Sequence, residues 1–362
     1  MTMTNFLFNI VRKFDPERAH LLTIQALKLG LTPKYSNNSD AALTSEVFGI
    51  KFQNPIGLAA GFDKSAEAFY SLDKLGCGFV EVGTLTLKPQ AGNERPRVFR
   101  LEEDQAIINR YGFNNDGLSR AVKRLSKRVK STGVLGINIG INKDSTTPIA
   151  DYVEALRIVS PLADYITINI CSPNTPGLRD LQSSEKLEKL LKSIEKSRFE
   201  NEVKTLTPPI LLKIAPDLTE KEIKEIAQIA LKTGVSGLIV SNTTVTRPSF
   251  IKGNRKIEQG GLSGPPLFEL STKKLAQTYL ACKGKIPLIG VGGVDSAETA
   301  YAKIRAGANL VQLYTALTYR GPCLFKSIND GLNLLIKNDN FRNVQDAVGI
   351  DAKYWADKKI LN

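Results

Sequence analysis

The sequence is poor in the side chains that build disulfide frameworks and metal sites. Its four cysteines, Cys77, Cys171, Cys282 and Cys323, are scattered without any C-x-x-C pair, and His20 is the single histidine. Spacing of this kind argues against a disulfide framework and against a zinc site. We therefore expect a reducing compartment and no bound metal.

Long apolar runs are also missing. No stretch reaches the roughly 18 consecutive apolar residues of a transmembrane helix, and the start lacks the apolar run and cleavage site of a signal peptide. The protein is therefore expected in the cytosol or on a membrane face. Because no transit peptide is visible, we favour a peripheral position on the cytoplasmic side of a bacterial inner membrane.

Length and charge narrow the class of protein. The 362 residues fit one large α/β barrel of about 250 residues with additions. The net charge of +13 favours the binding of anions, such as a phosphate-bearing cofactor, a carboxylate substrate or an acidic lipid surface. A proteome that is rich in lysine throughout would give the same positive net charge without any anionic ligand. No basic stripe interleaved with aromatics is present, so we expect no nucleic-acid binding.

From about Pro55 onward, short runs rich in β-branched residues alternate with amphipathic stretches, as in repeated β-α units. Each run is mostly apolar, as strands buried on both faces should be. Eight such runs predict a closed TIM (β/α)8 barrel rather than an open sheet. They cover residues 56–60, 79–83, 134–139, 165–170, 210–214, 237–241, 287–291 and 310–314. Residues 44–52 alternate separately and predict a small hairpin at the barrel bottom.

Two short helices are predicted ahead of the barrel, over residues 5–14 and 15–29. Asp15 can cap the second, Pro16 suits its first position, and Gly30 suits its end. The first helix is crowded with apolar residues. It either packs on the barrel or forms an amphipathic lid that touches lipid and shelters an apolar tunnel.

These elements suggest a division into two domains. Residues 1–40 would form the helical extension, and residues 41–362 the barrel domain.

Barrel enzymes take their reacting groups from the carboxyl ends of the strands, and this sequence fills those ends with polar residues. After the seventh and eighth strands stand Gly293 and the pair Tyr314 and Thr315, where backbone N–H groups of barrels commonly hold a phosphate. Gly264, in a preceding long loop, either adds a backbone contact or belongs to a plain flexible loop.

Five strand-end motifs together resemble one family. They are AAGFDK at 59–64, NRYGFN at 109–114, SPNTPGLR at 172–179, KIAPDL at 213–218 and SNTT at 241–244. In this order they resemble the class 2 dihydroorotate dehydrogenases, over about residues 15–322. The resemblance implies oxidation of dihydroorotate to orotate in pyrimidine synthesis, with FMN as hydride acceptor and a membrane quinone as final electron acceptor.

The resemblance also implies the residues of the reaction. Ser172 would be the base that takes the C5 proton, with Thr175 and Phe113 near the proton exit path. Cys171 should face away from the ligand, because neighbouring side chains of an extended segment point to opposite sides. Serine has a pKa far from neutrality, so it needs a positioned network to act as a base.

Substrate and cofactor contacts follow by position. Dihydroorotate offers a carboxylate and ring amides, which a cation and side-chain amides can bind. The implied substrate residues are Lys64, Asn109, Arg110, Tyr111, Gly112, Phe113, Asn169, Asn174, Asn242 and Thr243. The implied FMN residues are Ala59, Ala60, Gly61, Thr84, Asn138, Asn169, Lys213, Ser241, Gly264, Gly293, Tyr314 and Thr315. Among them, Lys213 would stabilise the negative charge of reduced FMN.

The resemblance places a quinone site under the N-terminal helices. His20, Arg100 and Tyr314 would bind the quinone head group, and the extension itself favours class 2 over class 1. The expected partners are dihydroorotate or orotate, a membrane quinone and an anionic membrane surface, and we expect a monomer.

Three alternatives remain open at this point. The first is a related FMN barrel, such as a class 1 or dihydropyrimidine dehydrogenase-like enzyme. The second is a flavin-free lyase or isomerase that uses Lys64 or Lys213 on a phosphorylated sugar. The third is a flavin- or lipid-binding protein without turnover.

Overall fold

Eight parallel strands close into a barrel in the computed structural model, which describes residues 11–35, 40–128, 133–200 and 208–360. The barrel order is β10-β12-β13-β3-β4-β7-β8-β9, and each neighbouring pair is parallel. The strands are β3 (Ile56–Leu58), β4 (Phe79–Leu85), β7 (Val134–Ile139), β8 (Tyr165–Asn169), β9 (Ile210–Ile214), β10 (Gly237–Val240), β12 (Leu288–Val291) and β13 (Leu310–Leu313). The predicted TIM barrel is therefore confirmed, and all eight predicted runs are strands of it.

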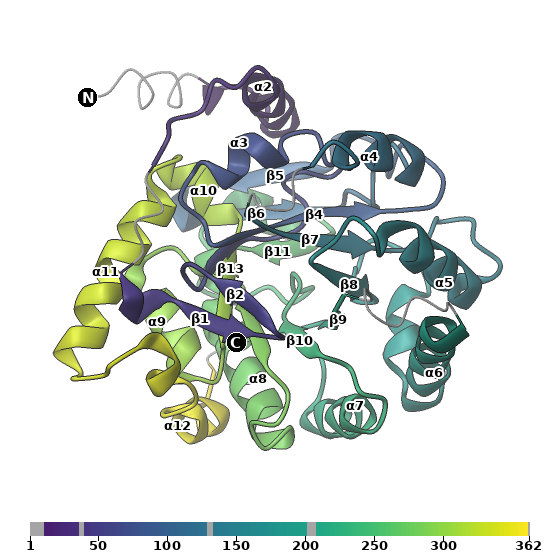
Figure 1. Cartoon of the computed structure of the whole chain (residues 1–362). Helices are drawn as coiled ribbons and strands as arrows, with labels where there is room; N and C mark the ends of the chain where they lie inside the picture. Colours follow the sequence, from purple (N-terminus) through teal and green to yellow (C-terminus); the bar gives the residue numbers. More distant parts are fainter. Residues whose placement is uncertain (1–10, 36–39, 129–132, 201–207, 361–362) are drawn as a thin grey trace.

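Helices surround the barrel (Figure 1). They are α3 (Phe69–Asp73), α4 (Leu118–Leu125), α5 (Pro148–Val159), α6 (Ser184–Glu200), α7 (Glu220–Lys232), α8 (Phe268–Ala281), α9 (Ala297–Arg305), α10 (Thr315–Arg320), α11 (Leu324–Asn338) and α12 (Ala352–Asp357). Side chains fix where several of them begin. Thr219 and Glu222 form a reciprocal capping box at the start of α7, and Ser296 caps α9.

The bottom of the barrel is closed by an antiparallel hairpin, as predicted. Its strands β1 (Ser45–Val47) and β2 (Ile50–Phe52) lie across the barrel end in Figure 1. The hairpin side chains Val47 and Phe52 join the apolar cluster inside the barrel, beside Phe79 and Tyr165. Burying these side chains excludes water from the axis and leaves the opposite end for chemistry.

The N-terminal extension contains helix α2 (Pro16–Lys28), which begins and ends as predicted. The Asp15 carboxylate accepts hydrogen bonds from two backbone N–H groups of the first turn, and Gly30 follows the helix at a positive φ of 75°. In Figure 1, α2 lies outside the ring of helices, above β5. The predicted first helix lies outside the described residues up to residue 10, and residues 12–14 form a turn rather than helix.

A three-stranded antiparallel sheet over the barrel mouth was not predicted. It consists of β5 (Val98–Leu101), β6 (Ala106–Asn109) and β11 (Gly261–Ser263), with β6 in the middle. Its apolar face buries Phe99 and Leu262 in a small separate core. The alternative of a plain flexible loop around Gly264 is wrong for its first residues, because 261–263 pair with β6.

Six short 3₁₀ helices complete the described structure. They are η1 (Ala41–Leu43), η2 (Glu102–Asp104), η3 (Leu178–Gln182), η4 (Asn254–Ile257), η5 (Pro265–Leu267) and η6 (Val344–Ala347). In the part of the chain that the structure describes, no helix has the length and apolar character to span a membrane.

Candidate active site

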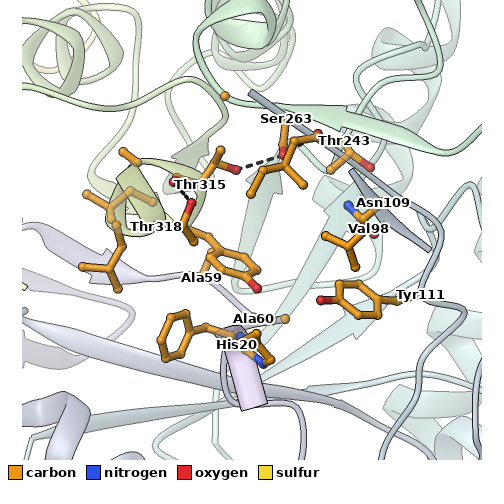
Figure 2. Close-up of a pocket in the computed structure, with 18 of the residues that line it drawn as sticks. His20, Ala59, Ala60, Val98, Asn109, Tyr111, Thr243, Ser263, Thr315 and Thr318 are labelled. Atoms are coloured by element: carbon orange, nitrogen blue, oxygen red, sulfur yellow. Dashed lines mark hydrogen bonds between the residues drawn. The ribbon is translucent and has the colours of Figure 1, made fainter. Parts of the chain in front are cut away.

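A cavity of about 820 Å³ opens at the carboxyl ends of the barrel strands, and most of the predicted site residues line it. Strands from distant parts of the sequence deliver them to this one place (Figure 2). The predicted residues on its wall are His20, Ala59, Ala60, Gly61, Lys64, Thr84, Arg100, Asn109, Tyr111, Gly112, Phe113, Asn169, Ser172, Asn174, Lys213, Ser241, Asn242, Thr243, Gly264, Gly293, Tyr314 and Thr315.

Three predicted residues do not reach the cavity wall. Arg110 turns away from it: the guanidinium donates to the Glu258 carboxylate at 2.8 Å and to the carbonyl of Pro96 at 2.9 Å. The Arg110 side chain therefore holds the loop, and its substrate contact stays a prediction. Thr175 is buried in the loop behind Ser172, and Asn138 is buried beneath the wall.

Asn138 belongs to a buried hydrogen-bond network that is centred on the Glu81 carboxylate. The Asn138 amide donates to the Glu81 carboxylate at 2.7 Å, so its oxygen is left to accept from Thr84 Oγ1 at 2.6 Å. Asn169 Nδ2 in turn donates to Thr84 Oγ1 at 2.9 Å. Each amide is thereby fixed in one orientation, since a reversed amide would leave a buried group unsatisfied.

Sequence reasoning missed Glu81, although a signal was available. It is the single charged residue of the buried strand β4, and its carboxylate also accepts from Tyr165, Thr167 and Gln312. Buried charges in proteins are paired or fully hydrogen-bonded, so an acid inside an apolar strand indicates a network at the barrel axis.

The cysteine beside Ser172 faces away from the cavity, as predicted. Cys171 is fully buried, and its Sγ lies 3.1 Å from Asn169 Oδ1 and accepts from Asn242 Nδ2 at 3.2 Å. Burial raises the pKa of this thiol to about 11. Cys171 therefore stays protonated at neutral pH, while the neighbouring Ser172 lies on the cavity wall.

Lys64 stands where the predicted substrate and quinone sites meet. Its Nζ is 3.3 Å from His20 Nε2 and 4.1 Å from the centre of the Tyr111 ring. Burial, with a smaller effect of the Arg97 charge, lowers the pKa of Lys64 to about 7 against the opposing charges of Glu17 and Asp63. Burial and then the Lys64 charge hold the pKa of His20 well below its usual value. The imidazole is therefore neutral at pH 7.

A buried ion pair fastens α2 to the barrel, and sequence reasoning missed it. Arg97 Nη2 donates to the Glu17 carboxylate at 2.7 Å, and both side chains are nearly inaccessible. Burial opposes the charge of Glu17, but hydrogen bonds and charges from Arg97 and Arg95 lower its pKa overall. Arg100 holds the segment before α2, because its Nη1 donates to the carbonyls of Arg12 and Phe14 at 2.7 and 2.9 Å.

Comparison with known proteins gives the family. A model of the family described as dihydroorotate dehydrogenase matches residues 42–336. The dihydroorotate dehydrogenase (quinone) of Brucella ovis is 51% identical over 354 residues, 96% of each chain. That of Parvibaculum lavamentivorans is 51% identical over 93% of this chain and 95% of its own. The chain belongs to the dihydroorotate dehydrogenase family.

Solved structures of dihydroorotate dehydrogenases agree with this assignment. The crystal structure of the Eimeria tenella enzyme in complex with ferulenol superposes with a TM-score of 0.90 at 42% identity, covering 93% of this chain and 96% of the other. The crystal structure of the ligand-free enzyme from the same organism superposes with a TM-score of 0.89. The family predicted from the five motifs is confirmed, and the alternative of a flavin-free lyase or isomerase is excluded.

Dihydroorotate dehydrogenases are flavoenzymes, and the cavity offers donors that fit an anionic flavin. Lys213 is buried on the cavity wall, and no hydrogen-bond or ion-pair partner for its ammonium occurs among the described residues. Gly293 lines the cavity at a positive φ of 75°, where a Cβ would lie 2.5 Å from Phe268. Thr315 begins α10 and donates to Ser263 at 2.9 Å (Figure 2). A buried lysine without a partner among the described residues suits a flavin ring, and the backbone N–H groups of a glycine turn suit a flavin phosphate.

Proposed function

We propose that this chain oxidises dihydroorotate to orotate for pyrimidine synthesis, with FMN bound at the barrel mouth and a membrane quinone as the electron acceptor. The observation that carries the proposal is the meeting of Ser172, Lys64 and four asparagine amides on one cavity wall that continues under α2. Relatives named dihydroorotate dehydrogenase (quinone) at 51% identity over nearly the full chain support the same reaction.

The substrate side is formed by one cation and a set of amides. The Lys64 ammonium would bind the carboxylate of dihydroorotate, and the amides of Asn109, Asn174 and Asn242 would pair with the ring carbonyl and N–H groups. Thr243 closes this side near Asn109 (Figure 2). Gly112 and Phe113 complete the wall.

Ser172 would act as the base toward C5 of the substrate. Its Oγ accepts a hydrogen bond from the backbone N–H of Asn174 at 3.2 Å, which stabilises negative charge on the oxygen as its own proton leaves. Thr175 is buried behind it in the same loop and would help to carry that proton away. Phe113 lies on the cavity wall and would border the path by which the proton leaves.

FMN would accept the hydride from C6 of the substrate. Thr84, Asn169, Lys213 and Ser241 would hold the ring, and the Lys213 ammonium would stabilise negative charge on it. Gly264, Gly293 and Thr315 would bind the phosphate through backbone N–H groups and a hydroxyl. Asn138 would act from below, by fixing Thr84 and Asn169.

The quinone would enter between α2 and the barrel. His20, Arg100 and Tyr314 lie on that side of the cavity, and the apolar side chains of Leu22 and Leu31 also line it. Residues 1–40 would form a membrane-facing unit on the barrel of residues 41–362. An anionic surface on the cytoplasmic side of the inner membrane suits the net charge of +13, and we propose that a monomer suffices.

A spectral experiment tests this function. The purified protein should be yellow, anaerobic dihydroorotate should bleach the flavin absorbance, and a soluble quinone should restore it. These two separate half-reactions predict ping-pong kinetics. A colourless protein, or a yellow one that dihydroorotate does not bleach, would overturn the proposal, and recovery with fumarate or NAD⁺ but not quinone would overturn its acceptor.

A further inference from the structure

A lysine with no acidic partner in the described part of the chain is buried behind the predicted phosphate turn. Lys303 lies in α9 with 0% of its surface exposed. Its Nζ donates to Ser271 Oγ at 2.6 Å and lies 5.2 Å from the centre of the Phe268 ring. Among the described residues, no ion pair includes Lys303, and burial alone lowers the pKa of its amine.

Ordinary packing does not account for this side chain. An amine taken out of water without a counter-charge is unfavourable, and a methionine would fill the same space without that cost. The backbone of β12 packs closely against this region, because a Cβ on Gly290 would lie 3.0 Å from Leu275, 3.1 Å from Ala308 and 3.3 Å from Lys303. The helices α8 and α9 that hold Ser271 and Lys303 lie side by side (Figure 1).

Ser271 connects Lys303 to the cavity. The Ser271 hydroxyl can donate its one proton either to the carbonyl oxygen of Gly292 at 3.0 Å or to that of Phe268 at 3.1 Å. Because a peptide unit is planar and trans, a Gly292 carbonyl that points at Ser271 turns the N–H of Gly293 the opposite way. Gly292 and Gly293 line the cavity, and both have positive φ, 108° and 75°. Successive N–H groups in such a turn form an anion-binding concavity.

We propose that Lys303 is a positioning residue for the flavin phosphate. Through Ser271 it orients the peptide that presents the Gly293 N–H to the dianion. This inference rests on the proposed FMN site and deepens it. It assigns a function to a buried lysine that does not line the cavity itself.

Comparison of FMN with riboflavin tests the inference, because riboflavin lacks the phosphate. Full-length protein is stripped of flavin, and the dissociation constant of each ligand is measured by flavin fluorescence in the wild type and in Lys303→Met. We expect the affinity of the variant for FMN to fall at least about tenfold. The Gly293 N–H would no longer be held toward the phosphate, and a hydrogen bond to a charged group has about this magnitude. Riboflavin affinity should change less than about twofold.

A second variant keeps the test decisive if Lys303→Met does not fold. Ser271→Ala retains the lysine but removes the hydroxyl that connects it to the Gly292 carbonyl. The affinity of this variant for FMN should also fall more than its affinity for riboflavin. The melting temperature without flavin reports folding for both variants. Equal loss of FMN and riboflavin, or no loss of either, would overturn the role of Lys303 while leaving the FMN site intact. A wild type that binds both ligands equally well would overturn the phosphate site itself.

Discussion

Ser172 Oγ accepts a hydrogen bond from the Asn174 N–H, and this bond bears on how a serine can serve as a base. A free serine hydroxyl holds its proton too tightly for proton abstraction near neutral pH. A backbone donor aimed at the oxygen favours the state in which the hydroxyl proton has left. The neighbouring Cys171 thiol would lose its proton more readily in water, but it points into the protein and is bound by two asparagines.

Ser172→Ala should slow the bleaching of flavin by dihydroorotate about 10²- to 10⁴-fold, the usual contribution of a general base. The purified variant should remain yellow, because no flavin contact is removed. Stopped-flow absorbance at saturating dihydroorotate measures the effect. Ser183→Ala changes an exposed serine farther along the same loop and is the control. A near-normal rate in Ser172→Ala would refute the assignment.

Lys64 predicts how substrate binding depends on pH. Burial lowers the pKa of its ammonium to about 7 in the empty cavity, so the cation that binds a carboxylate is lost as pH rises through that value. Orotate affinity should therefore fall by up to about tenfold per pH unit above that pKa. Spectral titration of the flavin with orotate measures it.

Arginine stays protonated throughout this range. Lys64→Arg should thus bind orotate with little change in affinity over the same pH values. If the arginine variant shows the wild-type slope, the titrating group is not Lys64.

At the scale of elements, the buried ion pair between Glu17 and Arg97 helps to hold α2 in position. Glu17→Ala would leave the Arg97 guanidinium buried and unpaired, which costs about 3–5 kcal/mol of the free energy of unfolding. Chemical denaturation at neutral pH measures the loss. Glu102→Ala removes an exposed partner of Arg12 and should cost at most about 1 kcal/mol. Equal effects of the two substitutions would contradict the importance of burial.

The same pair adds a pH dependence. The folded pKa of Glu17 lies below its ordinary value of 4.5, so its stabilisation is complete above that value and is lost as pH falls through the folded pKa. Glu17→Gln should lack this part of the acid destabilisation. Denaturation of both proteins at a series of pH values below 5 would show identical curves if Glu17 were unpaired.

The sequence predicted the barrel elements well for a physical reason. Parallel strands buried on both faces must be continuously apolar, so each of the eight runs stood out. The sheet of β5, β6 and β11 could not be found in this way. Its strands have three or four residues, too few for a period of two to show, and their pairing joins segments about 150 residues apart.

The candidate site was predicted from motifs, and this explains why a few predicted residues do not line the cavity. A motif names neighbours in sequence, but Arg110 turns outward beside the inward Asn109. Sequence reasoning missed Glu17, Arg97 and Lys303. Their roles depend on burial and on partners that are remote in sequence, and no local motif shows either.

For the whole molecule, the apolar side chains exposed at α2 predict where the proposed membrane contact would be made. Leu21 of α2 and Leu29, the residue directly after the helix, are 48% and 77% exposed. Burying two leucines in lipid should favour binding by well over tenfold. The double variant Leu21→Asp, Leu29→Asp should therefore sediment far less with anionic lipid vesicles than the wild type.

Leu334→Asp is the matched control, because Leu334 is 63% exposed on α11, away from α2. Its sedimentation should equal that of the wild type. Equal losses for the two variants would indicate non-specific adsorption, and an unaffected α2 variant would place membrane contact elsewhere.

The 3.3 Å contact between Lys64 Nζ and His20 Nε2 couples the binding of an anion at Lys64 to the binding of a second ligand near His20. An anion that keeps Lys64 charged makes it a hydrogen-bond donor to Nε2, so the imidazole must carry its proton on Nδ1. A ligand near His20 that prefers this tautomer will bind more tightly when the anion is present. Thermodynamic linkage then requires that it tighten anion binding by the same factor.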